Sequence, residues 1–91
     1  MYSVIVQVSN KSGLHARPAS DLTMKAKEFS SSISIRNLDL EHPVDINAKS
    51  VVKIMAGKIK KGTRIEITAR GEDEKQAVDT LVDLLASGFG E

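Results

Sequence analysis

The sequence of 91 residues has no cysteine and no tryptophan, and its only aromatic residues are one tyrosine and two phenylalanines. Without cysteine the chain has neither disulfides nor thiolate nucleophiles, which suits a reducing compartment. So few aromatic rings argue against binding of single-stranded nucleic acid, which depends on base stacking. No apolar run approaches the roughly 18 residues of a membrane span, and no charged-then-apolar leader occupies residues 1–6. We therefore expect a cytoplasmic protein with no membrane partner and no nucleic-acid partner.

The chain also lacks a strong charge of either sign and any cluster of metal ligands. Its formal net charge is +1, and charges of both signs are spread along its length, so the composition demands no strongly acidic partner. The two histidines, His15 and His42, are isolated from each other and from ligand-spaced companions, so we expect no metal and no cofactor. The length predicts one small domain over 1–91.

Alternation of apolar and polar residues predicts four strands, over 2–9, 33–36, 44–47 and 64–70. Apolar residues at steps of three and four predict a helix from about Arg17 to Phe29. Ser50 is a preferred N-cap residue and predicts a short second helix that Gly57 ends. Asp73 and Gln76 have capping-box spacing before a third helix that ends at Gly88. The apolar stripes of the first and last helices are Ala19, Leu22, Ala26 and Phe29, and Ala77, Val78, Leu81, Leu84 and Leu85.

The predicted order is strand, helix, strand, strand, helix, strand, helix. The second and third strands are close enough in sequence to form a hairpin, and each helix has one apolar side. This arrangement predicts an α+β fold, with a mostly antiparallel sheet and the helices packed on one face.

The chemistry of the sequence is concentrated in residues 13–19, Gly-Leu-His-Ala-Arg-Pro-Ala. Pro18 suits the first helical position, and the residue before a proline is disfavoured in helical geometry, so we expect Arg17 at the boundary and His15 in the turn before it. A helix N-terminus attracts anions through its free N–H groups and its dipole. The same field favours neutral imidazole, which has the lone pair needed for nucleophilic attack.

Three neighbours of His15 fit a phosphoryl group. Arg17 can hold phosphate oxygens through two parallel hydrogen bonds, and at a helix start its charge opposes the dipole, which a bound anion would explain. Ser12 offers a hydroxyl. Gly13 allows a backbone conformation closed to residues with a Cβ and a close approach to a phosphate. The residues predict a histidine that becomes phosphorylated.

Residues 10–19 resemble the active-site segment of the HPr family, the histidine-containing phosphocarriers of the bacterial phosphoenolpyruvate-dependent sugar phosphotransferase system. Residues 48–50 and 71–78 are similar to two further segments of that family. The resemblance implies an open-faced sandwich of four strands and three helices. It also implies a carrier rather than an enzyme: phospho-enzyme I donates to Nδ1 of His15, which passes the group to an enzyme IIA of sugar uptake. We expect phosphate-stabilising roles for Arg17, Ser12 and Ala16, and partner contacts at Ser20, Met24, Val51, Val52 and Met55.

Ser50 has two interpretations that both stand. It caps a helix, a role worth about 1 kcal/mol. The resemblance also implies that some family members are phosphorylated at this serine by an HPr kinase/phosphorylase and others are not. A phosphoryl group there would add negative charge beside Val51, Val52 and Met55.

The sequence departs from the family pattern in three places. The connection over 38–43 is longer than usual, and Ser20 stands where alanine is common. After the second helix the family usually has leucine and then glycine, whereas here Gly57 comes one position earlier and is followed by Lys58. This last difference changes the surface on which partners would dock.

Two other functions remain open from the sequence. A nitrogen-related paralogue of the same system would use the same chemistry for regulation. A small RNA-binding module would use a basic cluster at Lys58, Lys60, Lys61 and Arg64, but the scarcity of aromatic residues and the low net charge count against it. A hydrolase fits least, because no carboxylate or second histidine accompanies His15 in the motif. His42 precedes a proline in a polar loop and is expected at the surface.

Overall fold

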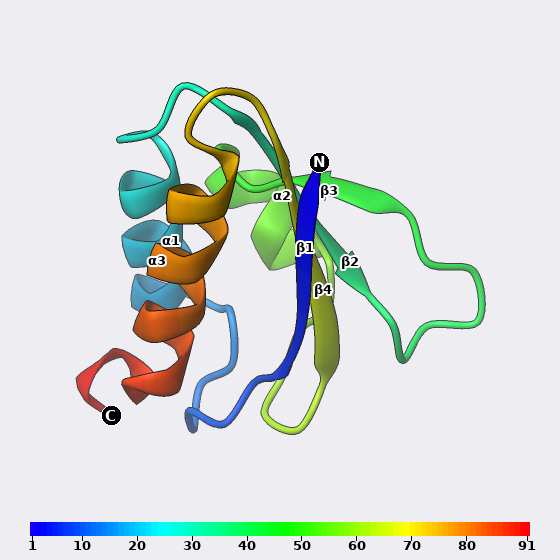
Figure 1. Ribbon diagram of the computed structural model, residues 1–91. Helices are drawn as coiled ribbons and strands as arrows, with labels where there is room; N and C mark the ends of the chain where they lie inside the picture. The colour runs from blue at the N-terminus through cyan, green and yellow to red at the C-terminus, as the bar shows by residue number, and fades with distance from the viewer.

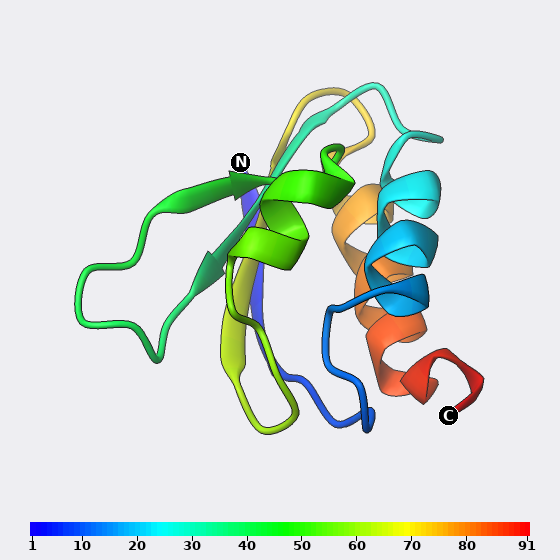
Figure 2. The same ribbon diagram turned by 180° about the vertical axis from the view of Figure 1, so that it is seen from behind.

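The computed structural model describes residues 1–91, which form a sheet of four strands with three helices packed on one face (Figure 1 and Figure 2). The strands lie in the order β1-β4-β2-β3, and every neighbouring pair is antiparallel. The predicted α+β open-faced sandwich is therefore confirmed. In chain order the elements are β1 (Tyr2–Gln7), α1 (Arg17–Ala26), β2 (Ser32–Asn37), β3 (Asp45–Asn47), α2 (Val51–Ala56), β4 (Arg64–Arg70), α3 (Glu74–Ala86) and the 3-10 turn η1 (Gly88–Gly90).

β4 holds the sheet together because it pairs with β1 on one side and β2 on the other. Ile67 lies opposite Val4 of β1 and opposite Ile35 of β2. Ile65, Ile67 and Ile35 are fully buried, while Thr68 faces the open side of the sheet. Strand side chains alternate between faces, so the period-two pattern of the sequence directly separates the core face from the solvent face.

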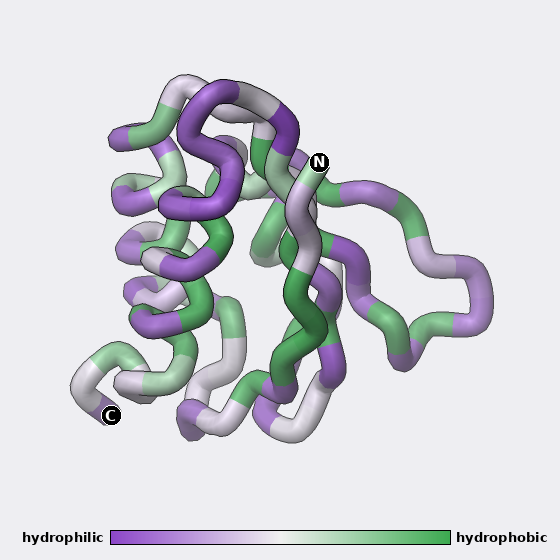
Figure 3. Tube along the Cα trace, viewed as in Figure 1, coloured by the Kyte–Doolittle hydropathy of each residue, from purple (hydrophilic) through white to green (hydrophobic).

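Each of the three helices packs apolar side chains against that core face. Leu22 of α1, Ile54 of α2 and Leu81 of α3 are all fully buried. Hydrophilic positions along α1 lie on the side away from the sheet (Figure 3). The predicted extension of α1 to Phe29 is wrong. The chain leaves the helix after Ala26 through a tighter turn, and Phe29 packs half-buried against the core from beyond the helix end.

The connection between β2 and β3 projects from the body of the protein, at the right of Figure 1. The predicted hairpin is confirmed, with Ser34 opposite Asn47. Arg36 Nη2 lies 2.9 Å from Asp45 Oδ1 across the two strands. His42 near the tip of the connection has a side chain that is 90% exposed, which confirms its expected surface position. The added length of this connection therefore lies in a peripheral hairpin.

The predicted capping box at the start of α3 is wrong. α3 begins after Asp73, but the Asp73 side chain makes no capping hydrogen bond to its own helix. Its carboxylate instead accepts from the backbone N–H groups of Ser30 (2.9 Å) and Ser31 (3.0 Å) and from the Ser31 hydroxyl. These donors lie in the loop after α1, so a tertiary contact takes the carboxylate that the local pattern assigns to the helix.

The same contacts make the stability of the fold depend on pH through Asp73. Hydrogen bonds from the Ser31 hydroxyl and then the Ser30 N–H lower the pKa of Asp73 from its ordinary value of 3.8 to about 2. A depressed pKa gives stability that is present above the ordinary value and is lost as the pH falls through the folded value. We expect wild-type stability relative to Asp73→Asn to decline between these two pH values. Thermal unfolding at several pH values measures this, with the exposed Glu72→Gln as control; parallel pH profiles for wild type and Asp73→Asn would contradict it.

The turn after α2 places its left-handed residue at a lysine. Gly57 has φ −76° and remains helical, whereas the following Lys58 has φ +58°. Glycine adopts the left-handed region freely, while other residues pay a steric cost there. Gly57 nevertheless packs closely, because a Cβ at this position would lie 2.6 Å from Cδ1 of Ile46, at the end of a side chain, and 3.2 Å from the backbone atom Ile54 O. The glycine thus serves packing, and the strained conformation falls on Lys58.

Replacing Lys58 with glycine should relax this strain. We expect Lys58→Gly to raise the free energy of unfolding by about 1 kcal/mol, since the left-handed penalty outweighs the extra chain entropy of glycine. Denaturant unfolding measures the change. Lys61→Gly, in the same turn without positive φ, is the matched control and should not stabilise. A Lys58→Gly variant less stable than wild type would show that the lysine side chain itself holds the turn.

Candidate functional site

His15 lies in the bend between β1 and α1, and its side chain is exposed. A short turn leads into this bend: the Gly13 N–H donates to Asn10 O (3.2 Å), and Asn10 Nδ2 donates back to Gly13 O (2.9 Å). The next residue, Leu14, is buried at 1% exposure, and its N–H donates to Ile59 O (2.9 Å). An anchored apolar residue therefore immediately precedes the histidine, which fixes the backbone while the imidazole remains open to solvent.

Gly13 allows the histidine loop to pack tightly on the chain before β4. Its φ is +61°, as the sequence predicts, and a Cβ would lie 2.5 Å from Ile59 O and 2.6 Å from the Cα of Lys60. The close approach that requires glycine is thus to the backbone of 59–60, whereas the sequence analysis expected an approach to phosphate. This contact brings residues from after α2 to the side of His15.

The start of α1 leaves its first N–H groups without protein acceptors. No side chain caps the helix, and its first turn contains no acidic residue. Arg17 is already helical, so the proline effect expected there is not seen; the unusual backbone falls on Ala16, with φ 54° and ψ −122°. Such a conformation in a residue with a Cβ costs about 1–3 kcal/mol. An uncapped helix start beside an exposed histidine is suited to an anion.

Ser12 already holds an anionic group. Its N–H donates to Glu91 Oε1 (2.9 Å) and its hydroxyl to Glu91 Oε2 (2.7 Å), while Asn10 Nδ2 donates to Oε1 (3.0 Å). The Ser12 hydroxyl bond, followed by the Ser12 N–H and Asn10 bonds, lowers the pKa of Glu91. The Ser12 hydroxyl, which the sequence analysis assigned to phosphate, therefore does bind an oxyanion, but it is the carboxylate of Glu91, a partner that the sequence did not indicate.

A cavity of about 400 Å³ lies beside the histidine. Ser12, His15 and Met55 share it, so the structure brings together three of the residues predicted for the site. It also adds Lys58 and Lys60, which were not among the residues predicted for the site. Arg17 does not line this cavity; it lies exposed at the start of α1.

The remaining predicted contact residues lie on α1 and α2, which pack against each other. Ser20 is exposed on α1, as is Met24, with 66% of its surface accessible. On α2, Val52 and Met55 are 74% and 39% exposed, whereas Val51 is half-buried and packs against the core. Three large apolar side chains on the two helices, those of Met24, Val52 and Met55, therefore remain in solvent, and Met55 also lines the cavity beside His15. We call Ser20, Met24, Val51, Val52 and Met55 the docking face.

Ser50 occupies the N-cap of α2, as predicted. Its backbone is extended, and its hydroxyl accepts from the Lys53 N–H at 3.3 Å. The side chain is half-buried. The structural role assigned to this serine is therefore confirmed.

Known proteins match this chain in sequence and in structure over almost its whole length. The family model described as "PTS HPr component phosphorylation site" matches residues 2–87. The chain belongs to the HPr family. The phosphocarrier protein HPr of Haemophilus influenzae is 40% identical over 85 residues, which cover 93% of this chain and 95% of that protein. The crystal structure of HPr-C-His from Thermoanaerobacter tengcongensis superposes with a TM-score of 0.92 at 40% identity, covering 100% of this chain and 98% of the other.

Other relatives of this HPr-family chain differ in length or in name. The multiphosphoryl transfer protein of Haemophilus influenzae is 43% identical over 84 residues, which are 92% of this chain and only 17% of that protein. The chain thus spans about a fifth of the length of the multiphosphoryl transfer proteins that it matches. The phosphocarrier protein NPr of Proteus mirabilis is 37% identical over 86 residues, covering 94% of this chain and 92% of that protein.

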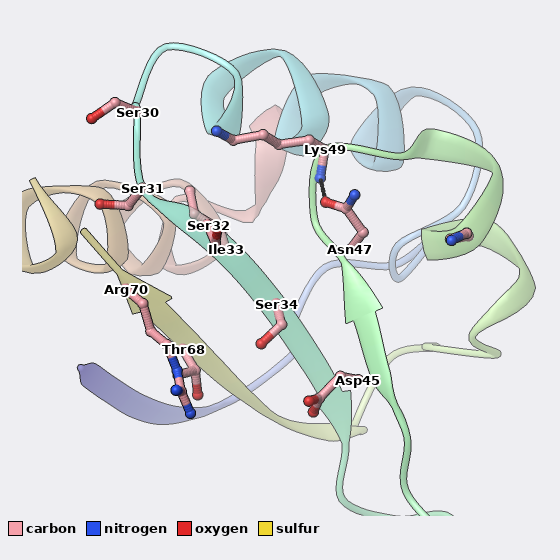
Figure 4. Close-up of a pocket in the computed structure, with 11 residues that line it drawn as sticks. Ser30, Ser31, Ser32, Ile33, Ser34, Asp45, Asn47, Lys49, Thr68 and Arg70 are labelled. Carbon is pink, nitrogen blue, oxygen red and sulfur yellow. Dashed lines mark hydrogen bonds between the residues drawn. The ribbon is translucent and has the colours of Figure 1, made fainter.

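A second cavity, of about 440 Å³, lies on the open side of the sheet, and His15 is not among the residues that line it (Figure 4). Ser34, Thr68 and Arg70 come from the strands, and Lys49 extends across from the start of α2. The Lys49 ammonium already donates to Phe29 O (2.7 Å). None of the residues predicted for the HPr-like site lines this cavity.

As for membranes, no helix here has the length and apolar character of a transmembrane span.

Proposed function

We propose that this chain carries a phosphoryl group on Nδ1 of His15, received from phospho-enzyme I and passed to an enzyme IIA. In the first step the lone pair of neutral imidazole attacks phosphorus, so that the new P–N bond forms as the P–N bond to the donor histidine breaks. In the second step the acceptor attacks and His15 leaves as neutral imidazole. The observation that carries the proposal is the exposed His15 immediately before an uncapped helix start with Arg17 beside it.

The geometry suits a carrier better than an enzyme. Phosphoryl transfer between histidines needs positioning and charge stabilisation rather than new covalent chemistry. The first-turn N–H groups of α1 and the guanidinium of Arg17 supply that charge stabilisation. A hydrolase would need a general base near neutral pKa. The nearby Glu91 has a lowered pKa and three hydrogen-bond donors on its carboxylate, which makes it a poor base.

The docking face supports the proposed exchange of two partners. Met24, Val52 and Met55 expose apolar surface on α1 and α2, Met55 shares a cavity with His15, and exposed apolar patches mark contact sites. Donor and acceptor must each bring a histidine to His15, so they would bind the same face in turn. Their complexes should be weak and short-lived, because a carrier must leave one partner to reach the next.

We further propose that Ser50 is a regulatory site for an HPr kinase/phosphorylase. A phosphoryl group on its oxygen would lie at the N-terminus of α2 and next to Val51 and Val52. The added charge of about −1.5 to −2 would oppose burial of the apolar docking face by a partner. Incubation with HPr kinase and ATP, with Ser50→Ala as control, tests this; an unmodified wild type would contradict it.

Phosphorylation by purified enzyme I and phosphoenolpyruvate tests the carrier function. We expect an acid-labile phosphoryl group, detected by intact mass and identified as N-phosphohistidine by phosphorus NMR. Parallel reactions with a sugar-type and a nitrogen-type enzyme I distinguish the uptake carrier that we propose from the regulatory paralogue, since each branch is expected to favour its own carrier. No phosphorylation by either enzyme would overturn the proposal.

A further inference from the structure

The segment between α2 and β4 lies directly against the histidine loop. The Leu14 N–H donates to Ile59 O (2.9 Å), so the residue before His15 is hydrogen-bonded to the residue between Lys58 and Lys60. Both lysines line the cavity that contains His15. Two lysines therefore share this cavity with His15, and they come from a different part of the chain than Arg17 does.

Hydrogen bonds fix the backbone of both lysines. Asn37, with only 2% of its surface exposed, donates through Nδ2 to Gly57 O (3.1 Å) and Lys58 O (3.5 Å). The Lys60 N–H donates to Thr63 Oγ1 (3.1 Å), and the Thr63 N–H donates to Lys60 O (3.0 Å). The two side chains thus start from defined points, while each lysine as a whole remains exposed.

Neither lysine serves the fold through its charge. The ion pairs of the protein link other residues, among them Arg64 to Asp39 (3.3 Å) and Lys75 to Asp79 (2.9 Å). Lys58 also adopts φ +58°, where glycine would be less strained. A strained residue with an unpaired charge beside a reactive group indicates a functional use of that side chain.

We propose that Lys58 and Lys60 stabilise the phosphoryl group on His15, in addition to Arg17 and the start of α1. The inference rests on the proposed phosphorylation of His15. Two cations near an added phosphoryl anion favour the phosphorylated form over the free form. The two lysines would therefore set how strongly this carrier retains its phosphoryl group relative to a carrier without them, which determines the direction of exchange with donors and acceptors.

A competition at equilibrium tests this. Isotope-labelled wild type and an unlabelled variant are mixed in equal amounts with catalytic enzyme I and limiting phosphoenolpyruvate, and intact mass gives the phosphoryl group on each. Enzyme I is only a catalyst, so changes in its docking affect how fast the distribution is reached and not the distribution itself. At low salt, Lys58→Met and Lys60→Met should each retain about threefold less phosphoryl group than wild type.

Three controls separate charge from structure. Lys58→Arg should partition within about 1.5-fold of wild type because it keeps the charge. Lys61→Met removes a charge from the same turn, outside the cavity lining, and should have little effect. The preference for wild type should weaken in high salt, where exposed charges are screened.

Each outcome decides the proposal. Equal partition between wild type and both methionine variants would overturn it, even if the variants are phosphorylated more slowly, because that result assigns the lysines to enzyme I docking. If Lys61→Met lost as much of the phosphoryl group to wild type as Lys58→Met and Lys60→Met do, the proposal would also be overturned. Removing any charge from this turn would then have the same effect. Absence of phosphorylation in wild type would instead contradict the carrier function itself.

Discussion

His15→Ala should accept no phosphoryl group from enzyme I while it retains the fold. His15 is exposed and makes no hydrogen bond that holds its loop; the loop is held by Asn10, Gly13 and Leu14. The free energy of unfolding should therefore change by no more than about 0.5 kcal/mol, as is usual for exposed positions. Intact mass after treatment with enzyme I and phosphoenolpyruvate should show no added phosphoryl group.

His42→Ala is the matched control for this prediction. It removes the other histidine of the chain, at a side chain that is 90% exposed near the tip of the β2–β3 connection. This variant should be phosphorylated like wild type. Phosphorylation that persists in His15→Ala, or that is lost in His42→Ala, would contradict the assignment of His15 as the phosphorylated residue.

Gly13→Ala should damage both the fold and the site. The alanine would have to adopt φ +61° with its Cβ 2.5 Å from Ile59 O, which is a backbone atom and cannot move aside as the end of a flexible side chain could. Left-handed strain and displacement of the contact should together lower the free energy of unfolding by about 3 kcal/mol. For a domain of this size that corresponds to a fall in Tm of roughly 12–24 °C.

The displacement should also slow phosphorylation, because Gly13 and Leu14 position His15 against Ile59. Denaturant unfolding measures the stability, and the initial rate of phosphorylation below the variant's Tm measures the effect on the site. Gly62→Ala is the matched control: φ is also positive, at +92°, but no atom lies within 4 Å of its Cβ. The free energy of unfolding of Gly62→Ala should fall only by the penalty of placing a residue with a Cβ at positive φ. Similar losses in both variants would show that the contact with Ile59 contributes nothing.

In residues 13–19, local sequence preferences predict part of the backbone structure correctly. Gly13 has the positive φ that its place in the turn predicts, and α1 begins at Arg17 beside the proline. The strain, however, falls on Ala16 rather than on the residue before the proline. Local preferences therefore identify the junction, but they do not identify the residue that takes the unusual backbone conformation.

The sequence by itself determined which strands and helices form, the order in which they occur and the place of His15 just before the first helix. These features follow from side-chain periodicity, turn residues and capping, all of which act over a few neighbouring positions. Only the tertiary structure decided the partners of Asp73, Ser12 and His15. Asp73 accepts hydrogen bonds from Ser30 and Ser31, which precede it in the sequence by 43 and 42 positions. Ser12 donates to Glu91, which follows it by 79 positions. Lys58 and Lys60 line the same cavity as His15, and the hydrogen bond from the Leu14 N–H to Ile59 O joins the two segments. Such contacts depend on how the layers pack, since a polar group takes whichever partner the completed fold brings within hydrogen-bond distance.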